Sequence, residues 1–250
     1  MSGTRQTHEG RGQRSSKLSG LAVALGCVLF LGGFIWGVIV YEPFTVPTPS
    51  MTPTIDAGDR VLAQRIDGSQ VHRGDVVVFR DASWGDLPLV KRVVGIGGDK
   101  VACCTDGKLT VNGKEISEPY LAKGSPASAS GIPATKVPQG RLFVLGDERR
   151  GSLDSSMHLQ DAGNGSVPRS AVDARVDAVA WPMRGMPHPS GFAGLPGGLS
   201  QPGPLTIVLT MVIVGAVLIL GGAAWPGLAS RMGGRSRSDG AGRGELAGVR

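Results

Sequence analysis

GLAVALGCVLFLGGFIWGVIVY, residues 20–41, and PLTIVLTMVIVGAVLILGGAAW, residues 204–225, are two apolar runs without a charged residue. A helix of this length spans about 33 Å at roughly 1.5 Å per residue, enough to cross the hydrocarbon core of a bilayer. Only a helix satisfies all the backbone polar groups of such a run in lipid. We therefore expect two transmembrane helices, at residues 20–41 and 204–225.

Each run has an alternative interpretation. The first follows a basic segment, as a removable signal peptide does, but it exceeds the usual 7–15 apolar residues and YEPFTVP follows it without a small-residue cleavage site. The second run has the composition of a buried core helix, but its length and the arginines that follow it favour a span. We interpret the first run as a retained anchor and the second as a membrane span.

Charge is distributed unevenly along the chain, whose net charge is +6. The excess lies in two basic tails, residues 1–19 and 226–250, whereas residues 42–203 carry equal numbers of basic and acidic side chains. No basic face for nucleic acid is expected in this middle region. Basic residues beside membrane spans stay in the cytoplasm. We therefore expect a cell-membrane protein with two spans, both termini cytoplasmic and the middle region extracytoplasmic.

The middle region is predicted to be mainly β, an antiparallel and partly barrel-like domain over residues 42–184. A Gly/Pro-rich tether, residues 185–203, is expected to join it to the second span. Asn112-Gly113 between two short apolar runs is a strong signal for a two-residue hairpin. The strands are expected at residues 61–63, 75–79, 87–96, 108–111, 114–116, 141–145 and 172–181.

Two residues of this domain could carry chemistry. Ser50 lies in TVPTPSMTPTI, residues 45–55, where prolines restrict the backbone and hold a serine in a rigid extended loop. The plainer interpretation is a Pro-rich linker. Lys91 lies in the strand LVKRVV, residues 89–94. A lysine there is commonly on an edge strand, but a buried amine has a lowered pKa and can take a proton from a serine.

Other chemistry has less support. The four histidines are His8, His72, His158 and His188, and a Ser/His/Asp site with His158 and Asp161 stays open. No CxxC or HExxH motif indicates a metal, and no glycine-rich phosphate loop indicates a nucleotide, so no cofactor is expected. Cys103 and Cys104 are adjacent, which is awkward for ordinary disulfide geometry, and we expect neither redox nor metal chemistry there.

Several segments taken in order resemble type I signal peptidases, the membrane-bound Ser/Lys proteases of the bacterial leader peptidase family. The resemblance covers residues 18–183. The matching segments are PSMTPT at 49–54, GDRVL at 58–62, RGDVVVF at 73–79, VKRVVG at 90–95, GD at 98–99, VNG at 111–113, FVLGD at 143–147, Arg149, Ser152, Asp154, Ser155, VP at 167–168 and WP at 181–182.

The resemblance implies a role for each matching residue. Ser50 is the expected nucleophile and Lys91 the expected general base. Ser152 is expected to orient the lysine amine, and the backbone N–H of Ser50 with the Thr48 hydroxyl is expected to form the oxyanion hole. Asp154 is expected to support the loop of residues 146–155, which carries Ser152.

This chain departs from the family pattern beside Asp154, with Glu148 where an asparagine is common and Ser156 where an arginine is common. The departures leave Arg92, next to the base, as the expected partner of Asp154.

The resemblance also implies the substrates, which are secretory preproteins cleaved after small residues of the Ala-x-Ala type. Ser50 follows Tyr41 by nine residues, so an extended chain places it within about 30 Å of the membrane. Two alternatives stay open: a catalytically impaired two-span envelope protein whose β domain binds a partner, and a Ser/Lys protease that cleaves another substrate, such as itself. The sequence does not predict an oligomeric state.

Overall fold

The computed structural model describes residues 9–104, 107–186, 190–199 and 201–234. Two compact units make up the chain, one of residues 39–203 and the other of residues 1–38 with 204–250. Of the features singled out above, His8, His188 and the ends of both basic tails lie outside the described residues.

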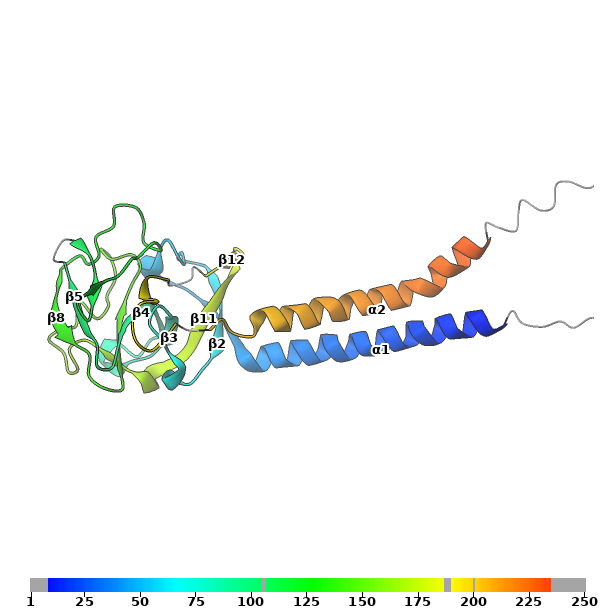
Figure 1. Cartoon of the computed structure of the whole chain (residues 1–250), viewed down its shortest axis with the longest axis horizontal. Coiled ribbons are helices and arrows are strands. Elements are labelled where there is room, and N and C mark those ends of the chain that lie inside the picture. Colours follow the sequence, from blue (N-terminus) through cyan, green and yellow to red (C-terminus); the bar gives the residue numbers. More distant parts are fainter. Residues whose placement is uncertain (1–8, 105–106, 187–189, 200, 235–250) are drawn as a thin grey trace, which may run out of the picture. The chain divides into compact units, whose positions relative to one another are not determined.

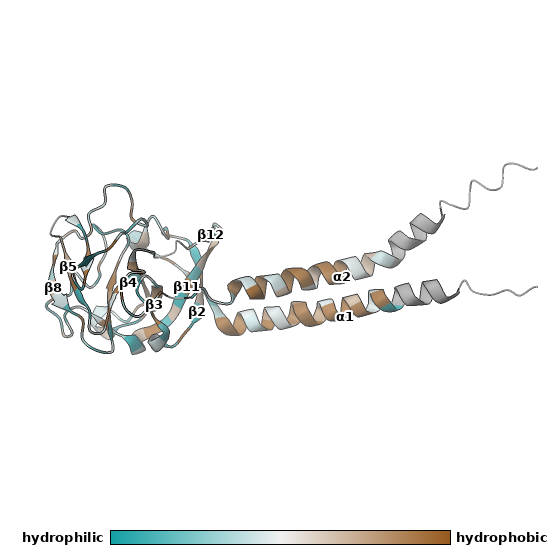
Figure 2. Cartoon of the chain, viewed as in Figure 1, coloured by the Kyte–Doolittle hydropathy of each residue, from teal (hydrophilic) through white to brown (hydrophobic). Residues whose placement is uncertain are grey.

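Two long helices, α1 (Glu9–Val40) and α2 (Leu205–Gly234), form the unit of residues 1–38 with 204–250. Their apolar parts, Lys17–Val40 and Leu205–Trp225, are 24 and 21 residues long, which is enough to cross a membrane. Most of the residues in these parts are exposed. Most are also apolar, as Figure 2 shows by the brown colour along both helices. Both predicted spans therefore form helices of the expected length and composition.

Glycines lie where α1 and α2 touch. A Cβ atom added to Gly26 would lie 2.8 Å from the carbonyl oxygen of Gly215, and one added to Gly33 would lie 2.9 Å from Cβ of Met211. Ser19 Oγ donates a hydrogen bond to the carbonyl oxygen of Gly222 at 2.5 Å. Small residues that let two backbones approach are typical of helix packing in membranes.

The other unit contains two antiparallel sheets and, among its described residues, only short 3₁₀ helices (Figure 1). The larger sheet has the strand order β1-β2-β11-β3-β4-β9-β10, and β12 pairs with β11. Its strands are β1 (Tyr41–Thr45), β2 (Arg60–Arg65), β3 (Val76–Phe79), β4 (Leu89–Ile96), β9 (Arg141–Leu145), β10 (Val167–Pro168), β11 (Val172–Trp181) and β12 (Arg184–Gly185).

The smaller sheet has the order β7-β6-β5-β8. Its strands are β5 (Lys100–Cys103), β6 (Thr110–Val111), β7 (Lys114–Glu115) and β8 (Ile132–Lys136). Asn112 and Gly113 join β6 to β7 with φ of 55° and 77°, the left-handed values that a two-residue hairpin turn requires. The adjacent Cys103 and Cys104, which the sequence marks as awkward partners, are joined by a disulfide.

Every predicted strand is present, and the mainly antiparallel β fold with an apolar helix near each end of the chain is confirmed. The end of the first helix and the presence of β8 differ from expectation. Helix α1 ends at Val40, and Tyr41 begins β1, where its hydroxyl donates to Asp177 at 2.8 Å. β8 lies inside the segment 122–140, whose polar composition indicates a loop.

Residues 190–199 of the expected tether pack against the β domain and do not form a free linker. Phe192 and Leu195 belong to the core cluster that also contains Val101 and Phe143. The carbonyl oxygen of Pro196 accepts a hydrogen bond from Arg73 at 2.5 Å. Residues 190–199 are therefore fastened to the β domain, because their two large apolar side chains gain burial that the glycine and proline count conceals.

Candidate active site

Ser50 is held by a short turn that two buried apolar residues follow. Thr48 is extended, as expected for a residue before proline, and Pro49 begins the 3₁₀ helix η1 (Pro49–Met51). The fixed φ of proline suits the first position of such a turn, so the expected extended loop is a helical turn at the serine itself. Met51 and Ile55 are fully buried and fix this segment against the larger sheet.

Lys91 lies on β4 at the point where its neighbour β9 ends. It pairs with Val77 of β3, whereas the pairing with β9 begins one residue later, between Arg92 and Leu145. Lys91 is 3% exposed and β4 lies between β3 and β9 in the sheet, so the edge-strand interpretation is wrong. Lys91 Nζ donates a hydrogen bond to Ser50 Oγ at 2.7 Å.

The lysine amine is held in an environment that favours its neutral form. Burial lowers the pKa of Lys91 from 10.5 to about 8, and the nearby charges of Asp154 and Asp147 oppose this shift only in part. No carboxylate of the described residues lies within ion-pair distance of the amine. At mildly alkaline pH the amine can therefore accept a proton from the serine hydroxyl that it contacts.

The other two hydroxyls of the expected site lie close to the serine. Thr48 Oγ1 is 3.3 Å from Ser50 Oγ. Ser152 Oγ is buried and, within the described part of the chain, has no hydrogen-bond partner, so the expected bond to the lysine amine is not formed. A Cβ atom on Gly146 would lie 2.2 Å from Ser152 Oγ and 2.5 Å from the carbonyl oxygen of Ser50. Only glycine fits between these two serines.

The expected pairing of Arg92 with Asp154 is wrong. Arg92 binds Asp147 through Nε at 2.8 Å and Nη2 at 2.7 Å, because Asp147 follows the end of β9 directly opposite Arg92. Asp154 accepts hydrogen bonds from the backbone N–H of Gly146 at 2.9 Å and from Ser156 Oγ at 2.7 Å. Ser156 thus satisfies the carboxylate at the position where the family commonly has arginine.

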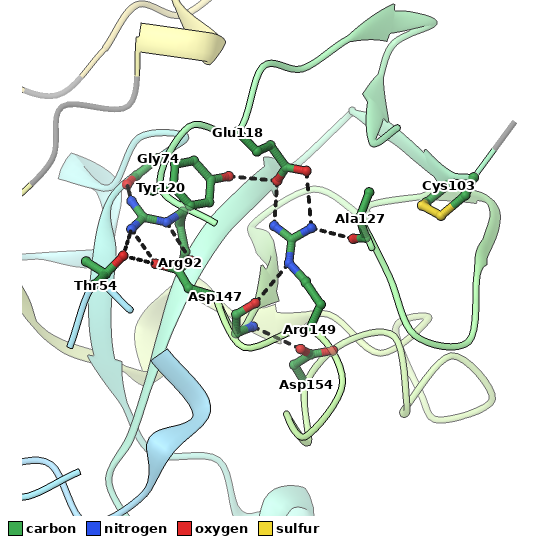
Figure 3. Close-up of polar contacts among 12 residues, drawn as sticks. Thr54, Gly74, Arg92, Cys103, Glu118, Tyr120, Ala127, Asp147, Arg149 and Asp154 are labelled. Atoms are coloured by element: carbon green, nitrogen blue, oxygen red, sulfur yellow. Dashed lines mark hydrogen bonds and ion pairs between the residues drawn. A yellow bond between two sulfur atoms is a disulfide. The ribbon is translucent and has the colours of Figure 1, made fainter. Parts of the chain in front are cut away.

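Two residues to which the sequence assigned no role complete this polar cluster (Figure 3). The ring of Tyr120 lies 3.9 Å from Cζ of Arg92, and Glu118 accepts from both Tyr120 and Arg149. Both precede the long loop before β8, and the only hint in the sequence was that Tyr120 is one of two tyrosines.

Alternative bases and metal ligands do not meet Ser50. His158 binds Asp161 at 2.7 Å and stacks on Trp84 with ring centroids 4.3 Å apart, while Ser50 Oγ contacts Lys91 and Thr48. The described residues contain no group of three histidine, cysteine or acidic side chains arranged to hold a metal. The Ser/His/Asp arrangement left open by the sequence is therefore not formed.

Comparison with known proteins adds a family to this geometry. The model of the family "Signal peptidase, peptidase S26" matches residues 18–181. A probable signal peptidase I from Mycobacterium leprae is 32% identical, over 60% of this chain and 71% of its own. Signal peptidase I from Mycobacterium tuberculosis is 31% identical, over 71% of this chain and 77% of its own. A solved signal peptidase I from Enterococcus faecalis is 27% identical, with a TM-score of 0.33 over 42% of this chain and 95% of its own.

Proposed function

The chain belongs to the signal peptidase family, peptidase S26, and on this premise we propose that Ser50 is its nucleophile and Lys91 its general base. Membership makes the protein a membrane-anchored type I signal peptidase, a serine peptidase. The observation that carries the proposal is the 2.7 Å hydrogen bond from a buried lysine amine to the Ser50 hydroxyl.

The first half of the reaction forms an ester. Neutral Lys91 removes the proton of Ser50, whose oxygen attacks the carbonyl carbon at the end of the signal peptide. The Ser50 N–H and the Thr48 hydroxyl donate to the developing oxyanion. The protonated Lys91 then gives its proton to the leaving amine, which frees the mature protein and leaves the signal peptide bound to Ser50.

The second half hydrolyses this ester. Lys91, neutral again, takes a proton from a water molecule that attacks the ester carbonyl. When the tetrahedral intermediate collapses, Lys91 returns the proton to Ser50. Ser152 is proposed to hold the amine in the direction of the reacting atoms, a role that its buried and unpartnered hydroxyl near Gly146 supports.

The proposed substrates are secretory preproteins cleaved after small residues at the −1 and −3 positions, as in Ala-x-Ala. Shallow pockets would exclude larger side chains by steric clash, and an extended substrate adds as a strand to a sheet edge. We place residues 42–184 outside the membrane with both termini cytoplasmic, since lysine and arginine beside α1 and α2 favour that orientation.

A cleavage assay tests the proposal directly. The full-length protein is incubated in detergent with a preprotein whose signal ends in Ala-x-Ala, and with a second substrate that has Trp at −1. We expect cleavage of the first substrate alone, and none with Ser50→Ala. The matched control is Ser83→Ala, because Ser83 is an exposed serine that, within the described part of the chain, bonds only to Asp81 in its own turn. Full cleavage by Ser50→Ala would overturn the assignment of the nucleophile.

A further inference from the structure

The segment from Glu118 to Ala127, between β7 and β8, reaches both arginines that flank the proposed site. Tyr120 is 5% exposed, and Arg149 is 4% exposed. The segment comes from the smaller sheet, whereas Ser50 and Lys91 are held by the larger one. It contributes no group to the proposed reaction itself, so its buried polar contacts need another explanation.

The first contact reaches the residue next to the base. Cζ of Arg92 lies 3.9 Å from the centroid of the Tyr120 ring, a cation–π geometry. The guanidinium donors of Arg92 bind Asp147, the carbonyl oxygen of Gly74 and Thr54 Oγ1. The Tyr120 hydroxyl donates to Glu118 at 2.7 Å. Glu118 is thereby linked to Arg92 through a single aromatic ring.

The second contact reaches the loop that carries Ser152. Arg149 binds Glu118 with both terminal nitrogens, at 3.2 Å and 2.5 Å. Its Nε donates to the carbonyl oxygen of Gly146 at 2.9 Å, and Nη1 also binds the carbonyl oxygen of Ala127. Figure 3 shows this guanidinium between Glu118, Ala127 and the loop after β9.

Gly146 is the position at which a small displacement would reach the serine. The backbone of Gly146 lies against Ser152 Oγ and against the carbonyl oxygen of Ser50. The backbone N–H of Glu148, two residues after Gly146, donates to the carbonyl oxygen of Ser50 at 3.0 Å. A shift of this loop therefore moves the surroundings of both Ser50 and the Lys91 amine.

We propose that Glu118 and Tyr120 are positioning residues of the peptidase: they couple Arg92, beside the base, to Arg149, which fixes Gly146 and with it the loop around Ser50. The proposal rests on the function proposed above and extends it to residues of the smaller sheet. The two guanidinium groups and the carboxylates of Asp147 and Glu118 balance in charge, so loss of Glu118 leaves Arg149 a buried cation without a carboxylate.

Displacement of the loop after β9 should change the pH dependence of the rate as well as lower the rate itself. Burial is the largest influence on the pKa of the Lys91 amine, and the charged groups that act on it are Asp154 and Asp147, both from the loop after β9. Water that enters beside a displaced Gly146 reduces this burial. The pKa of Lys91 then rises, and the rising limb of the pH–rate profile moves to higher pH.

The experiment compares Glu118→Gln and Tyr120→Phe with a matched control, Asp99→Asn. Asp99 also forms a buried two-bond pair with an arginine, Arg73, and it has no bond to the loop after β9. For each full-length variant, kcat and KM for an Ala-x-Ala preprotein are measured between pH 6 and 10, below the onset of thermal unfolding.

For Glu118→Gln we expect kcat to fall about 10-fold to 100-fold, as for a misplaced catalytic group, with KM unchanged and the rising limb at higher pH. Tyr120→Phe keeps the ring over Arg92 and leaves Glu118 bound to Arg149, so a fall of about 2-fold to 10-fold is expected. Asp99→Asn should keep kcat and the position of the limb even where it lowers the unfolding temperature.

Unchanged kcat and limb in Glu118→Gln would overturn the proposal, and so would an equal loss in Asp99→Asn. Where Glu118→Gln fails to fold, Tyr120→Phe alone decides, and wild-type kinetics for it overturn the proposal. Ser50→Ala runs in parallel. Activity in that variant would remove the proposed nucleophile, whereas an inactive Ser50→Ala beside unaffected Glu118 and Tyr120 variants removes only the positioning link.

Discussion

Lys91 and Arg92 are neighbours on β4, both are buried, and their surroundings differ in one respect. Arg92, 1% exposed, meets a carboxylate through two hydrogen bonds, and Lys91, 3% exposed, meets a hydroxyl. Burial lowers the pKa of the Arg92 guanidinium, but the hydrogen bonds and charge of Asp147 outweigh it, and the pKa is raised. Burial of Lys91 outweighs the charges of Asp154 and Asp147, which form no hydrogen bond with its amine, and the pKa of Lys91 falls to about 8.

The choice of partner decides which buried cation stays charged. The carboxylates nearest to Lys91 are both engaged elsewhere, Asp147 by Arg92 and Asp154 by Gly146 and Ser156. They attract the ammonium at a distance without an ion pair, so the amine remains able to lose its proton near neutral pH. Arg92 therefore supports the structure, and Lys91 is available for proton transfer.

The largest expected effect is on the rate. Lys91→Met keeps the apolar stem and removes the amine, so processing of an Ala-x-Ala preprotein should fall by at least about 10³-fold, the scale of general-base catalysis. The measurement is single-turnover cleavage by the purified full-length variant. Lys123→Met, at an exposed lysine in the loop before β8, is the control and should cleave at the wild-type rate. Appreciable cleavage by Lys91→Met would end the Ser/Lys account.

The same kind of change at the neighbouring residue, Arg92→Met, should lower the stability of the fold. Arg92→Met leaves Asp147, which is fully buried, as an uncompensated carboxylate, and we expect a loss of about 3–5 kcal/mol in the free energy of unfolding. Denaturant unfolding followed by circular dichroism measures it. Arg80→Met breaks the exposed pair with Asp173 and should cost at most about 1 kcal/mol. Equal losses in the two variants would contradict the importance assigned to burial.

Lys91→Met should be more stable than the wild type at neutral pH, in contrast to Arg92→Met. Below pH 8 the wild type keeps a buried ammonium at a cost of at most about 3 kcal/mol, given the lowering of the pKa from 10.5 to about 8. Between these two values the unfolded chain binds the proton and the folded chain does not. Wild-type stability therefore rises with pH in this window, and the advantage of Lys91→Met should fade.

Unfolding temperatures of both proteins from pH 6 to 10 test this expectation. A difference that stays constant, or that grows toward pH 10, would show that the buried ammonium does not carry the cost.

The smallest effect is expected beside Asp154. Ser156→Ala removes one hydrogen bond from the Asp154 carboxylate and leaves the bond from Gly146 in place, so the cost should be about 0.5–1.5 kcal/mol. Thermal unfolding and kcat measured together separate stability from activity. Complete loss of activity in this variant would mean that Ser156 does more than replace the common arginine.

Much of the fold could be predicted because its signals are local. The strand period, the Asn112-Gly113 turn and the two uncharged runs each depend on neighbours in sequence. The parts of the fold that the sequence did not predict depend on tertiary contacts. β8 forms within a polar segment because β5 supplies its hydrogen-bond partners, and residues 190–199 pack because Phe192 reaches a core made by distant strands.

The site divides in the same way. Ser50 and Lys91 could be named from motifs, and the structure brings them together across 41 positions. The partner of Arg92 was predicted wrongly because the register of β4 and β9, which places Asp147 beside it, is not visible in a linear pattern. Glu118 and Tyr120 lack any motif, since their contacts are with Arg149 and Arg92 on other elements.

The central claim is that an uncharged lysine amine activates the serine, and the pH dependence of single-turnover cleavage tests it most directly. The rate is measured from pH 5 to 10 with the full-length protein under conditions where it stays folded. We expect one rising limb with its midpoint near the Lys91 pKa of about 8 and a plateau above it. A rate that is flat across this range, or a limb near the ordinary histidine pKa of about 6.5, would contradict it.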